Sequence, residues 1–283
     1  MPSLPTMADG GARDLEGSVA IVTGASRGVG AATAVALGAA GCAVACAARA
    51  TDESPLSLPG TLDETVRRIE VAGGTALAVP TNLADDESVE AMVATTVERF
   101  GRVDILVNNA AITFPGDIEL AMRRFDLIFS VDLRAPVIAA RLVVPGMIER
   151  GRGAVVNVSS AAALNYFPGQ MAYGMAKAAL EHFTLSLAAQ LQPHAVAVNT
   201  FRIDVPVASE GFLAALADVD HSDWEPPEVA AEGIVWMLRQ PPSYTGHQDG
   251  MAELRAREGI MASRSARPHV QGPDRVTRSA LRL

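Results

Sequence analysis

The sequence predicts an α/β fold in three layers, in which a doubly wound parallel β-sheet carries helices on both faces. Short apolar segments alternate along the chain with longer helical patterns, which is typical of repeated βαβ units. These apolar segments contain few polar residues, as expected for parallel strands that are buried on both faces. Hydrophobic residues make up 49% of the 283 residues and charged residues 19%, so the chain can form a large core. Right-handed crossovers between the strands then place helices on each side of the sheet.

Each expected element follows from its local pattern. The expected strands are short and apolar, and they cover residues 18–23, 43–48, 76–79, 103–107, 154–158 and 195–199. The expected helices cover residues 62–72, 86–100, 122–150, 171–191 and 228–239, and a further alanine-rich helix follows residue 30. We expect one domain over residues 17–254, preceded by a polar N-terminal extension over residues 1–16.

The last segment, residues 255–283, differs from the rest in composition. It contains seven arginines against two acidic residues, together with Pro268 and Pro273. Such a basic run is either a solvated tail or a segment that docks on an acidic partner. We expect the solvated tail, because charge runs are usually solvated.

Charge and cysteine content exclude several classes of protein. The net charge of −9 argues against a general surface for nucleic acids or anionic lipids. Two cysteines, Cys42 and Cys46, cannot form a disulfide scaffold, and no histidine pair has the spacing of metal ligands, so we expect no metal site. The N-terminus lacks the apolar run of a signal peptide, and the uncharged stretch 28–48 consists mostly of small residues. We therefore expect a cytoplasmic protein that does not enter a membrane.

A glycine-rich turn joins the first strand to the helix that follows it. The turn reads Thr23-Gly-Ala-Ser-Arg-Gly-Val-Gly30 and places glycines at 24, 28 and 30. Glycines let the backbone turn sharply and come close to a pyrophosphate, while the N-terminus of the helix offers free N–H groups. The spacing differs from the commonest dinucleotide fingerprint. Its position between strand and helix nevertheless predicts a phosphate-binding loop.

The end of the second strand indicates which dinucleotide binds. An acidic residue there would bond the adenosine 2′-hydroxyl and repel a 2′-phosphate. This chain has Arg49 instead, and Arg27 lies in the nearby glycine-rich turn. Two guanidinium groups can hold a phosphate, so we expect NADP(H) rather than NAD(H). The alternative is that both are ordinary surface arginines.

Tyr173 and Lys177 are the strongest candidates for catalysis. They are one helical turn apart and therefore share a helix face. A protonated lysine beside a tyrosine lowers the pKa of the phenol, so that the hydroxyl can pass a proton. The chain has 22 arginines and no lysine other than Lys177, which favours a chemical role for this ammonium over an ordinary surface pair. Ser160 ends the fifth expected strand, where its hydroxyl can hold a carbonyl oxygen.

Taken together, these motifs resemble the short-chain dehydrogenase/reductase family over roughly residues 15–250. The matching pieces are TGASRGVG at 23–30, NNAA at 108–111, VVNVSS at 155–160 and YGMAK at 173–177. A weaker similarity points to a hydroxysteroid-dehydrogenase-like subgroup, through LPGT at 58–61 and residues 253–260. The resemblance implies a Rossmann-type fold.

The resemblance also implies roles for individual residues. Tyr173 is expected as the general acid/base, Lys177 as the group that lowers its pKa and holds the nicotinamide ribose, and Ser160 as the group that orients the substrate oxygen. The cofactor site is expected to comprise Gly24, Ser26, Arg27, Gly28, Val29, Gly30, Arg49, Asn82, Leu83 and Asn109, together with Tyr173 and Lys177. Residues 122–150 and 171–191 are expected to form the contact of a homodimer or homotetramer.

The chain departs from the family pattern at three places. Asp132 stands where the family has a catalytic Asn whose backbone carbonyl holds a water that leads to the lysine. We include Asp132 among the catalytic candidates, because its carboxylate can pair with Lys177. Asn82 stands where an Asp usually meets the adenine, and Ile203-Asp204 replaces the Pro-Gly that usually follows the sixth strand.

These observations predict an NADP(H)-dependent oxidoreductase that acts on a fairly apolar carbonyl or secondary alcohol. We expect substrate contacts from residues 161–170 and from a mobile segment over residues 204–224. Asp132 and Ile203-Asp204 favour an alternative, a cofactor-binding relative with weakened catalysis that acts as a sensor or scaffold. An isomerase or dehydratase is a third possibility, because a fold does not fix the reaction.

Overall fold

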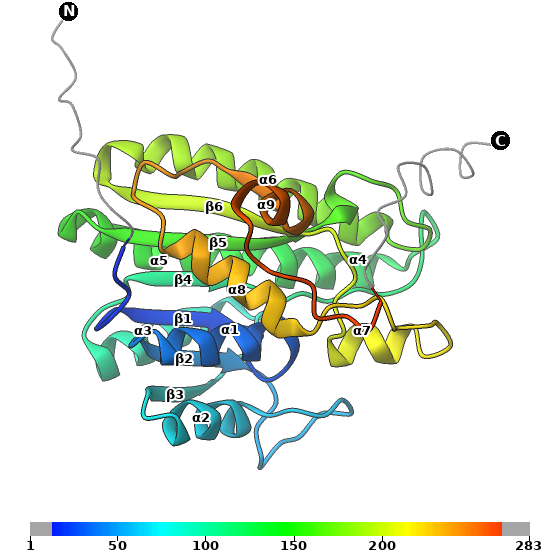
Figure 1. The fold of residues 1–283 in the computed structure, drawn as a ribbon, viewed down its shortest axis with the longest axis horizontal. Coiled ribbons are helices and arrows are strands. Elements are labelled where there is room, and N and C mark those ends of the chain that lie inside the picture. The colour runs from blue at the N-terminus through cyan, green and yellow to red at the C-terminus, as the bar shows by residue number, and fades with distance from the viewer. Residues whose placement is uncertain (1–12, 268–283) are drawn as a thin grey trace, which may run out of the picture.

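A parallel sheet forms the centre of the computed structural model, which describes residues 13–267. Its strands have the order β3-β2-β1-β4-β5-β6-β7, and every neighbouring pair is parallel (Figure 1). The strands are β1 (Val19–Thr23), β2 (Ala43–Ala48), β3 (Thr75–Pro80), β4 (Ile105–Asn108), β5 (Gly153–Ser160), β6 (Val196–Ile203) and β7 (Gln248–Gly250). Because the chain crosses from β3 on one side of β1 to β4 on the other, the sheet is doubly wound. The predicted three-layer, Rossmann-type fold is confirmed.

Helices cover the sheet on both faces (Figure 1). They are α1 (Gly28–Ala39), α2 (Leu62–Val71), α3 (Asp86–Phe100), α4 (Met122–Phe129), α5 (Ala135–Arg150), α6 (Met171–Leu191), α7 (Glu210–Ala215), α8 (Pro227–Leu238) and α9 (Met251–Glu258). Side chains of α1, α2, α8 and α9 form one hydrophobic core with one face of the sheet, while α3, α5 and α6 form a second core with the other face. The sequence analysis did not predict α7, β7 or α9, which are all short.

The helix predicted over residues 122–150 is interrupted in the structure. A π-helical turn, Ser130–Arg134, separates α4 from α5 and contains the buried Asp132. Such a turn inserts one extra residue into the helical ladder, which changes the direction in which the local side chains point. Pro145, in contrast, lies inside α5 without ending it.

The C-terminal part of the described chain, residues 255–267, packs on the domain instead of extending into solvent. We call it the C-terminal arm. Glu225, which is fully buried, accepts hydrogen bonds from the Arg255 side chain at 2.8 Å and from the Arg264 backbone at 2.8 Å. Met261 is also fully buried. The predicted boundary at residue 254 therefore falls inside α9, and the rest of the predicted tail, from residue 268, lies outside the described residues, as do residues 1–12.

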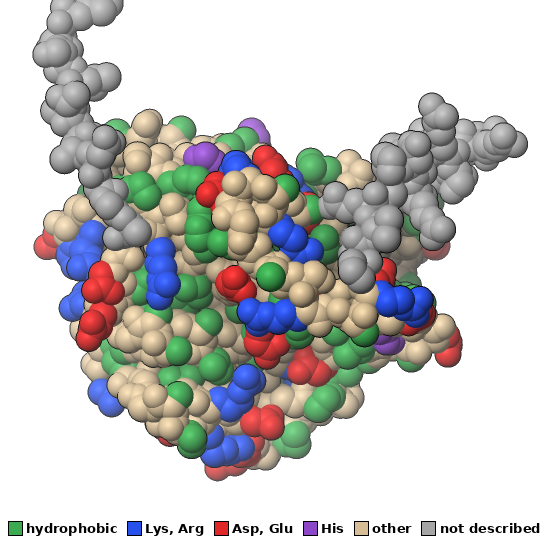
Figure 2. Space-filling model, viewed as in Figure 1, with side chains coloured by type: hydrophobic (Ala, Val, Ile, Leu, Met, Phe, Trp, Pro, Cys, Tyr) green, Lys and Arg blue, Asp and Glu red, His purple; other side chains and the backbone are tan. Residues whose placement is uncertain are grey.

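Acidic and basic side chains are interspersed on the face of the molecule shown in Figure 2, with no single-sign patch over the helices α1 and α8.

The two cysteines lie inside the core. Burial raises the pKa of both Cys42 and Cys46 to about 12, so neither is a reactive thiolate at neutral pH.

A chain of buried polar side chains connects the strands at the centre of the sheet to α6. The Asn108 amide donates to Asn157 Oδ1 at 2.8 Å, and the Asn157 amide donates to Thr184 Oγ1 at 2.9 Å. The Thr200 hydroxyl donates to the same Thr184 oxygen at 3.0 Å. These bonds tie β4, β5 and β6 to the helix that carries Tyr173 and Lys177.

We expect Asn157→Leu to lower the free energy of unfolding by about 2–3 kcal/mol, because it leaves the buried Asn108 amide without its acceptor and removes one of the hydrogen bonds to the Thr184 hydroxyl. Urea denaturation measures this change. Asn165→Ala, which removes an exposed amide that bonds the Ala161 carbonyl, is the matched control and should change the free energy by less than about 0.5 kcal/mol. Equal stability of Asn157→Leu and the wild type would show that the buried chain contributes nothing.

Candidate active site

The predicted site residues come together at one edge of the sheet, where the parallel strands end. The glycine-rich turn follows β1, Arg49 follows β2, Asn82 and Leu83 follow β3, Asn109 follows β4, and Ser160 is the last residue of β5. Ligands of open α/β sheets bind outside these carboxyl ends, beside the point where the strand order reverses. Here that point lies between β1 and β4.

The glycine-rich turn is packed so closely that side chains are excluded from it. A Cβ on Gly30 would lie 2.2 Å from the carbonyl oxygen of Gly24, and a Cβ on Gly24 would lie 2.8 Å from Asn109 Nδ2. Gly24 and Gly28 also have positive φ angles of 69° and 54°. Asn109 holds the turn from β4, because its amide donates to the Thr23 carbonyl at 2.8 Å. The turn thus presents bare backbone at the N-terminus of α1.

Arg27 is the N-cap residue of α1, but its side chain does not cap the helix. Its Nη2 atom donates to the Gly60 carbonyl at 3.1 Å, and no side-chain bond caps the helix. Burial lowers the pKa of Arg27. The Glu210 carboxylate opposes this lowering, and the positive charge of Arg49 lowers the pKa further. The positive charge of Arg49, the second arginine expected to hold a phosphate, is thus felt at Arg27.

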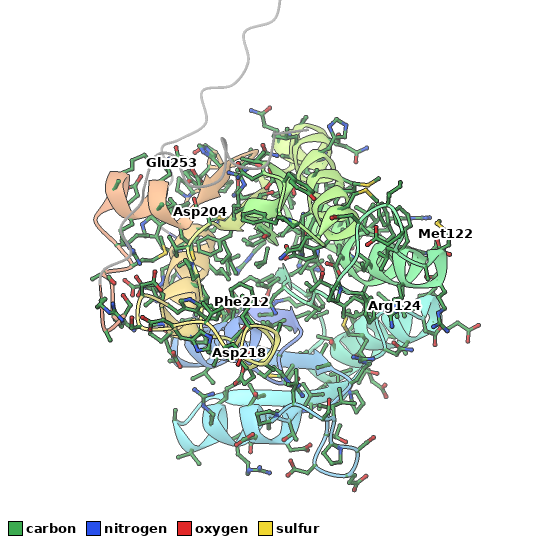
Figure 3. All side chains as sticks on the ribbon, turned by 90° about the vertical axis from the view of Figure 1, so that its right-hand side faces the viewer. Met122, Arg124, Asp204, Phe212, Asp218 and Glu253 are labelled. Atoms are coloured by element: carbon green, nitrogen blue, oxygen red, sulfur yellow. The ribbon has the colours of Figure 1, made fainter. Side chains whose placement is uncertain are left out.

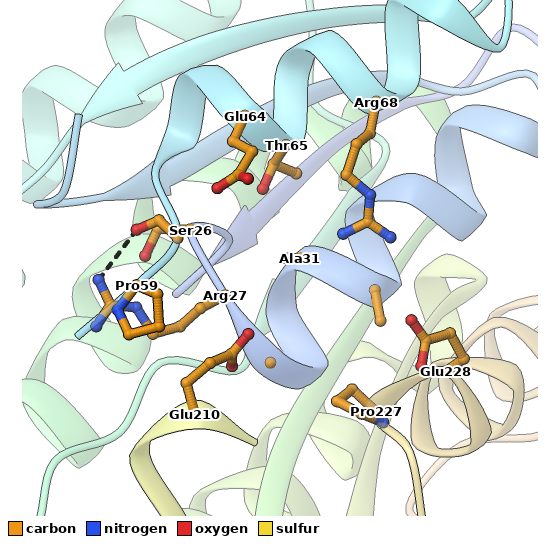
Figure 4. Close-up of a pocket in the computed structure, with 13 residues that line it drawn as sticks. Ser26, Arg27, Ala31, Pro59, Glu64, Thr65, Arg68, Glu210, Pro227 and Glu228 are labelled. Atoms are coloured by element: carbon orange, nitrogen blue, oxygen red, sulfur yellow. Dashed lines mark hydrogen bonds between the residues drawn. The ribbon is translucent and has the colours of Figure 1, made fainter. Parts of the chain in front are cut away.

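A pocket of about 220 Å³ lies beside this turn, between α1, α2 and the N-termini of α7 and α8 (Figure 4). Its charged lining residues have both signs: Arg27 and Arg68 on one hand, Glu64, Glu210 and Glu228 on the other. Ser26 also lines this pocket.

The other predicted adenosine-side residues differ in exposure. Asn82 is exposed, Leu83 is partly buried, and the Asn82 oxygen already accepts from the Ala84 backbone at 3.2 Å. Val29 offers only its backbone, since its side chain belongs to the core.

Tyr173, Lys177 and Ser160 form a second cluster at the same edge. The Lys177 Nζ atom lies 5.6 Å from the centre of the Tyr173 ring, and the Ser160 hydroxyl lowers the pKa of Tyr173. Lys177 is only 2% exposed, and its ammonium donates to the Val158 carbonyl at 3.0 Å. Burial lowers the pKa of Lys177, and the Asp132 carboxylate opposes that shift.

Asp132 faces this cluster from the π-helical turn. It is fully buried, and its Oδ1 atom accepts from the Ile112 backbone at 2.9 Å. Its Oδ2 atom lies 3.9 Å from Lys177 Nζ and has no hydrogen-bond partner among the described residues. Burial raises the pKa of Asp132 to about 7, although Lys177 and the Ile112 N–H favour the charged form. For Tyr173, burial raises the pKa, the Asp132 charge raises it further, and the bond to Ser160 lowers it.

Residues 204–224 lie over this edge of the sheet. Phe212 of α7 stacks on Trp224 with ring centres 4.6 Å apart, and Phe212 stands near the middle of the edge in Figure 3. Trp224 is only 7% exposed and supports this segment from below. Asp204 accepts from the Ala252 backbone at 3.0 Å and so holds the start of α9. The position that departs from the family Pro-Gly thus serves the contact between β6 and α9.

Sequence reasoning missed several groups that shape the site. The carbonyl of Val158 and the N–H of Ile112 are backbone groups, and no residue type signals them. Asn157 and Thr184 could have been suspected as polar residues inside apolar patterns. Glu210 gave no signal at all, because its position depends on how α7 packs.

Two further properties concern the described residues as a whole. Within residues 13–267, no three His, Cys, Asp or Glu side chains gather in a group that could hold a metal ion. No helix of this part of the chain combines the length and apolarity needed to span a membrane.

A doubly wound sheet with a glycine-rich turn after β1 and a Ser, Tyr and Lys cluster beside it defines a dinucleotide-binding oxidoreductase class. Comparison with known proteins agrees. The family model described as short chain dehydrogenase matches residues 18–205. The chain belongs to this family, and the resemblance predicted from its motifs is confirmed.

Three known proteins illustrate how similar this chain is to others in sequence and in structure. Hydroxysteroid dehydrogenase-like protein 2 of Danio rerio is 30% identical over 249 residues, which cover 87% of this chain and 60% of the relative. The chain thus spans less than two thirds of that relative. A metagenomic short-chain oxidoreductase solved in complex with NADP has a TM-score of 0.70 at 28% identity and covers 84% of this chain and 96% of its own. Carveol dehydrogenase from Mycobacterium avium, solved with NAD, shares the fold with a TM-score of 0.73 at 22% identity, over 84% of this chain and 96% of its own.

Proposed function

We propose that the protein is an NADP(H)-dependent oxidoreductase that interconverts a carbonyl compound and a secondary alcohol. The observation that carries this proposal is the cluster in which the Lys177 ammonium, buried and bonded to the Val158 carbonyl, lies 5.6 Å from the centre of the Tyr173 ring beside the end of β5 that carries Ser160. A phenol beside a buried cation is a proton donor and acceptor. Few other roles account for a lysine that is buried in this position.

Each residue of the cluster has a separate role in the reaction at the substrate oxygen. The chemistry that the bound dinucleotide supplies is hydride transfer between the nicotinamide and the carbonyl carbon. In reduction the Tyr173 hydroxyl donates its proton to the carbonyl oxygen, and in oxidation the phenolate takes the proton from the alcohol. Lys177 stabilises the phenolate by its charge, and Ser160 donates a hydrogen bond to the same substrate oxygen.

The glycine-rich turn fits a dinucleotide, because a Cβ at Gly24 or Gly30 would collide with neighbouring backbone or side-chain atoms. The free N–H groups of α1 suit a pyrophosphate. Arg27 lies in the turn after β1 and Arg49 follows β2 at the same edge of the sheet, which supports a 2′-phosphate bound near them and hence NADP(H) rather than NAD(H). Ser26, Asn82, Leu83 and Asn109 would complete the site.

The surroundings support an apolar substrate and an oligomer. Phe212 and Leu216 are partly exposed on the segment that overlies the site, and Leu164 is exposed on the facing turn. Leu142 of α5 and Met175 and Leu185 of α6 expose large apolar side chains. We infer that these helices form the contact of a homodimer or homotetramer in a cytoplasmic enzyme.

One observation favours a second candidate function. An ionised Asp132 raises the pKa of Tyr173, which makes the phenol a weaker acid and leaves less phenolate at neutral pH. A cofactor-binding protein with little turnover, acting as a sensor or scaffold, would tolerate such a carboxylate. The intact set of Ser160, Tyr173 and Lys177 supports the enzyme over this alternative.

We expect Tyr173→Phe to reduce kcat by about 100-fold to 10,000-fold, because it removes the proton that is exchanged with the substrate oxygen. NADPH oxidation with a panel of apolar ketones measures this loss, and NADPH binding should persist. Tyr244→Phe, which removes a hydroxyl bonded to Asp249 far from the cluster, is the matched control. Unchanged turnover in Tyr173→Phe would refute the mechanism.

We expect Arg49→Ala to weaken NADPH binding about tenfold and to change NADH binding by less than about twofold, because only NADPH carries the 2′-phosphate. Fluorescence titration with both cofactors measures the difference. Arg99→Ala on α3 removes an arginine far from the turn and should leave both affinities unchanged. An equal loss of affinity for NADPH and NADH would mean that Arg49 does not recognise the 2′-phosphate.

We expect Asp132→Asn to retain or raise activity and to shift the rate profile of alcohol oxidation to lower pH by about one unit. Asp132 gains its charge as the pH rises through about 7, and that charge raises the pKa of Tyr173. Without it, Tyr173 loses its proton at lower pH. Asp126→Asn on α4, an exposed acid, should leave the profile in place. Activity that collapses in Asp132→Asn would instead give the carboxylate a role of its own.

A further inference from the structure

The segment that contains α7 rests directly on the glycine-rich turn. A Cβ on Gly28, the first residue of α1, would lie 2.9 Å from Ser209 Cβ and 3.4 Å from Glu210 Oε2. Figure 4 shows the Glu210 side chain reaching from α7 towards the first turn of α1. A carboxylate thus stands at the place where the turn offers its backbone to a ligand.

The Glu210 carboxylate is not fully satisfied by hydrogen bonds in this position. Its Oε2 atom is buried without a hydrogen bond among the described residues, and the same holds for the Nε atom of Arg27 on the other side of the pocket. Glu210 acts on Arg27 through its charge, since it raises the pKa of Arg27 against the effects of burial and of Arg49. The carboxylate therefore balances part of the positive charge of the turn.

Positive charge and free N–H groups at the first turn of a helix attract an anion. Arg27 and Arg49 add two cations to this region. A phosphate that enters the turn must take up the space next to Gly28 and meets a negative charge there. Glu210 and a phosphate group would repel each other at such a separation.

We propose that Glu210 lowers the affinity of the protein for its dinucleotide, because its carboxylate stands in for a phosphate at the glycine-rich turn until α7 moves away. This inference rests on the proposed function, since it requires that the turn binds a dinucleotide. Glu210 is thus a residue that sets cofactor affinity, and α7 is the element that carries it.

The packing around α7 allows this movement. None of the residues of α7 is buried, so the helix is held mainly by its contact with Trp224. The base of the segment is fixed, because Val207 pairs with Glu225, and Glu225 is held by Arg255 and Arg264. The stacking of Phe212 on Trp224 holds α7 in its present position. Movement is therefore expected within the segment between Val207 and Glu225.

The test compares Glu210→Gln with Asp218→Asn, which removes the same charge from an exposed position of the same segment. Dissociation constants are measured by fluorescence titration with NADPH and NADH, and by competition with ADP-ribose, which carries the pyrophosphate without the nicotinamide. Thermal denaturation confirms that both variants are folded. All titrations are repeated at low and high ionic strength.

We expect Glu210→Gln to bind all three ligands about fivefold to tenfold more tightly at low ionic strength, because a like charge is removed beside the phosphates. The gain should shrink in about 0.5 M salt, which screens charges. Asp218→Asn should match the wild type. A merely structural role for Glu210 would not produce a gain that depends on salt.

The outcomes separate this inference from the proposed function. If the wild type binds NADPH and Glu210→Gln binds no more tightly, the inference is wrong while the proposed function stands. If the wild type binds nothing but Glu210→Gln binds, both are supported. If neither protein binds any of the three ligands, both fail.

Discussion

The structure depends on one buried charge, the ammonium of Lys177. A lysine in the interior is unstable unless its charge is met by nearby oxygens. Here Val158 offers a carbonyl from the end of β5, and Asp132 offers a carboxylate from the π-helical turn between α4 and α5. These contacts fix α6 against β5, and with it the positions of Tyr173 and Ser160. The interruption of the long helix is thus part of the same arrangement, because it turns Asp132 inward.

Two carboxylates face positively charged side chains of the site, one at each end of it. Asp132 faces Lys177 in the core, and Glu210 faces Arg27 at the glycine-rich turn. In each case one carboxylate oxygen is buried without a hydrogen bond among the described residues. A buried oxygen of this kind is unfavourable unless a proton, a cation or a ligand satisfies it. Each end of the site therefore holds a carboxylate oxygen that can respond to pH or to a ligand.

The C-terminal arm gives the segment over the site a firm base. Glu225 receives bonds from Arg255 and Arg264, while Glu225 and Val207 join the two ends of the segment that bears α7. Met261 packs into the core beneath. The arginines of this arm have neighbours of opposite charge inside the domain. Arg255 is the most buried of these four arginines, while the Arg264 and Arg267 side chains remain largely exposed.

The sequence by itself determined the sheet, the main helices and the two motifs, because periodicity and spacing are local. The expected bounds of α3 and α6 agree with the structure, and glycines 24, 28 and 30 were assigned to a turn whose packing now requires them. Tertiary structure alone decided that a π-helical turn carries Asp132, that α7 brings Glu210 to Gly28, and that residues 255–267 fold back onto Glu225. These contacts join segments far apart in the chain, and their energies depend on burial and distance, which no local pattern records.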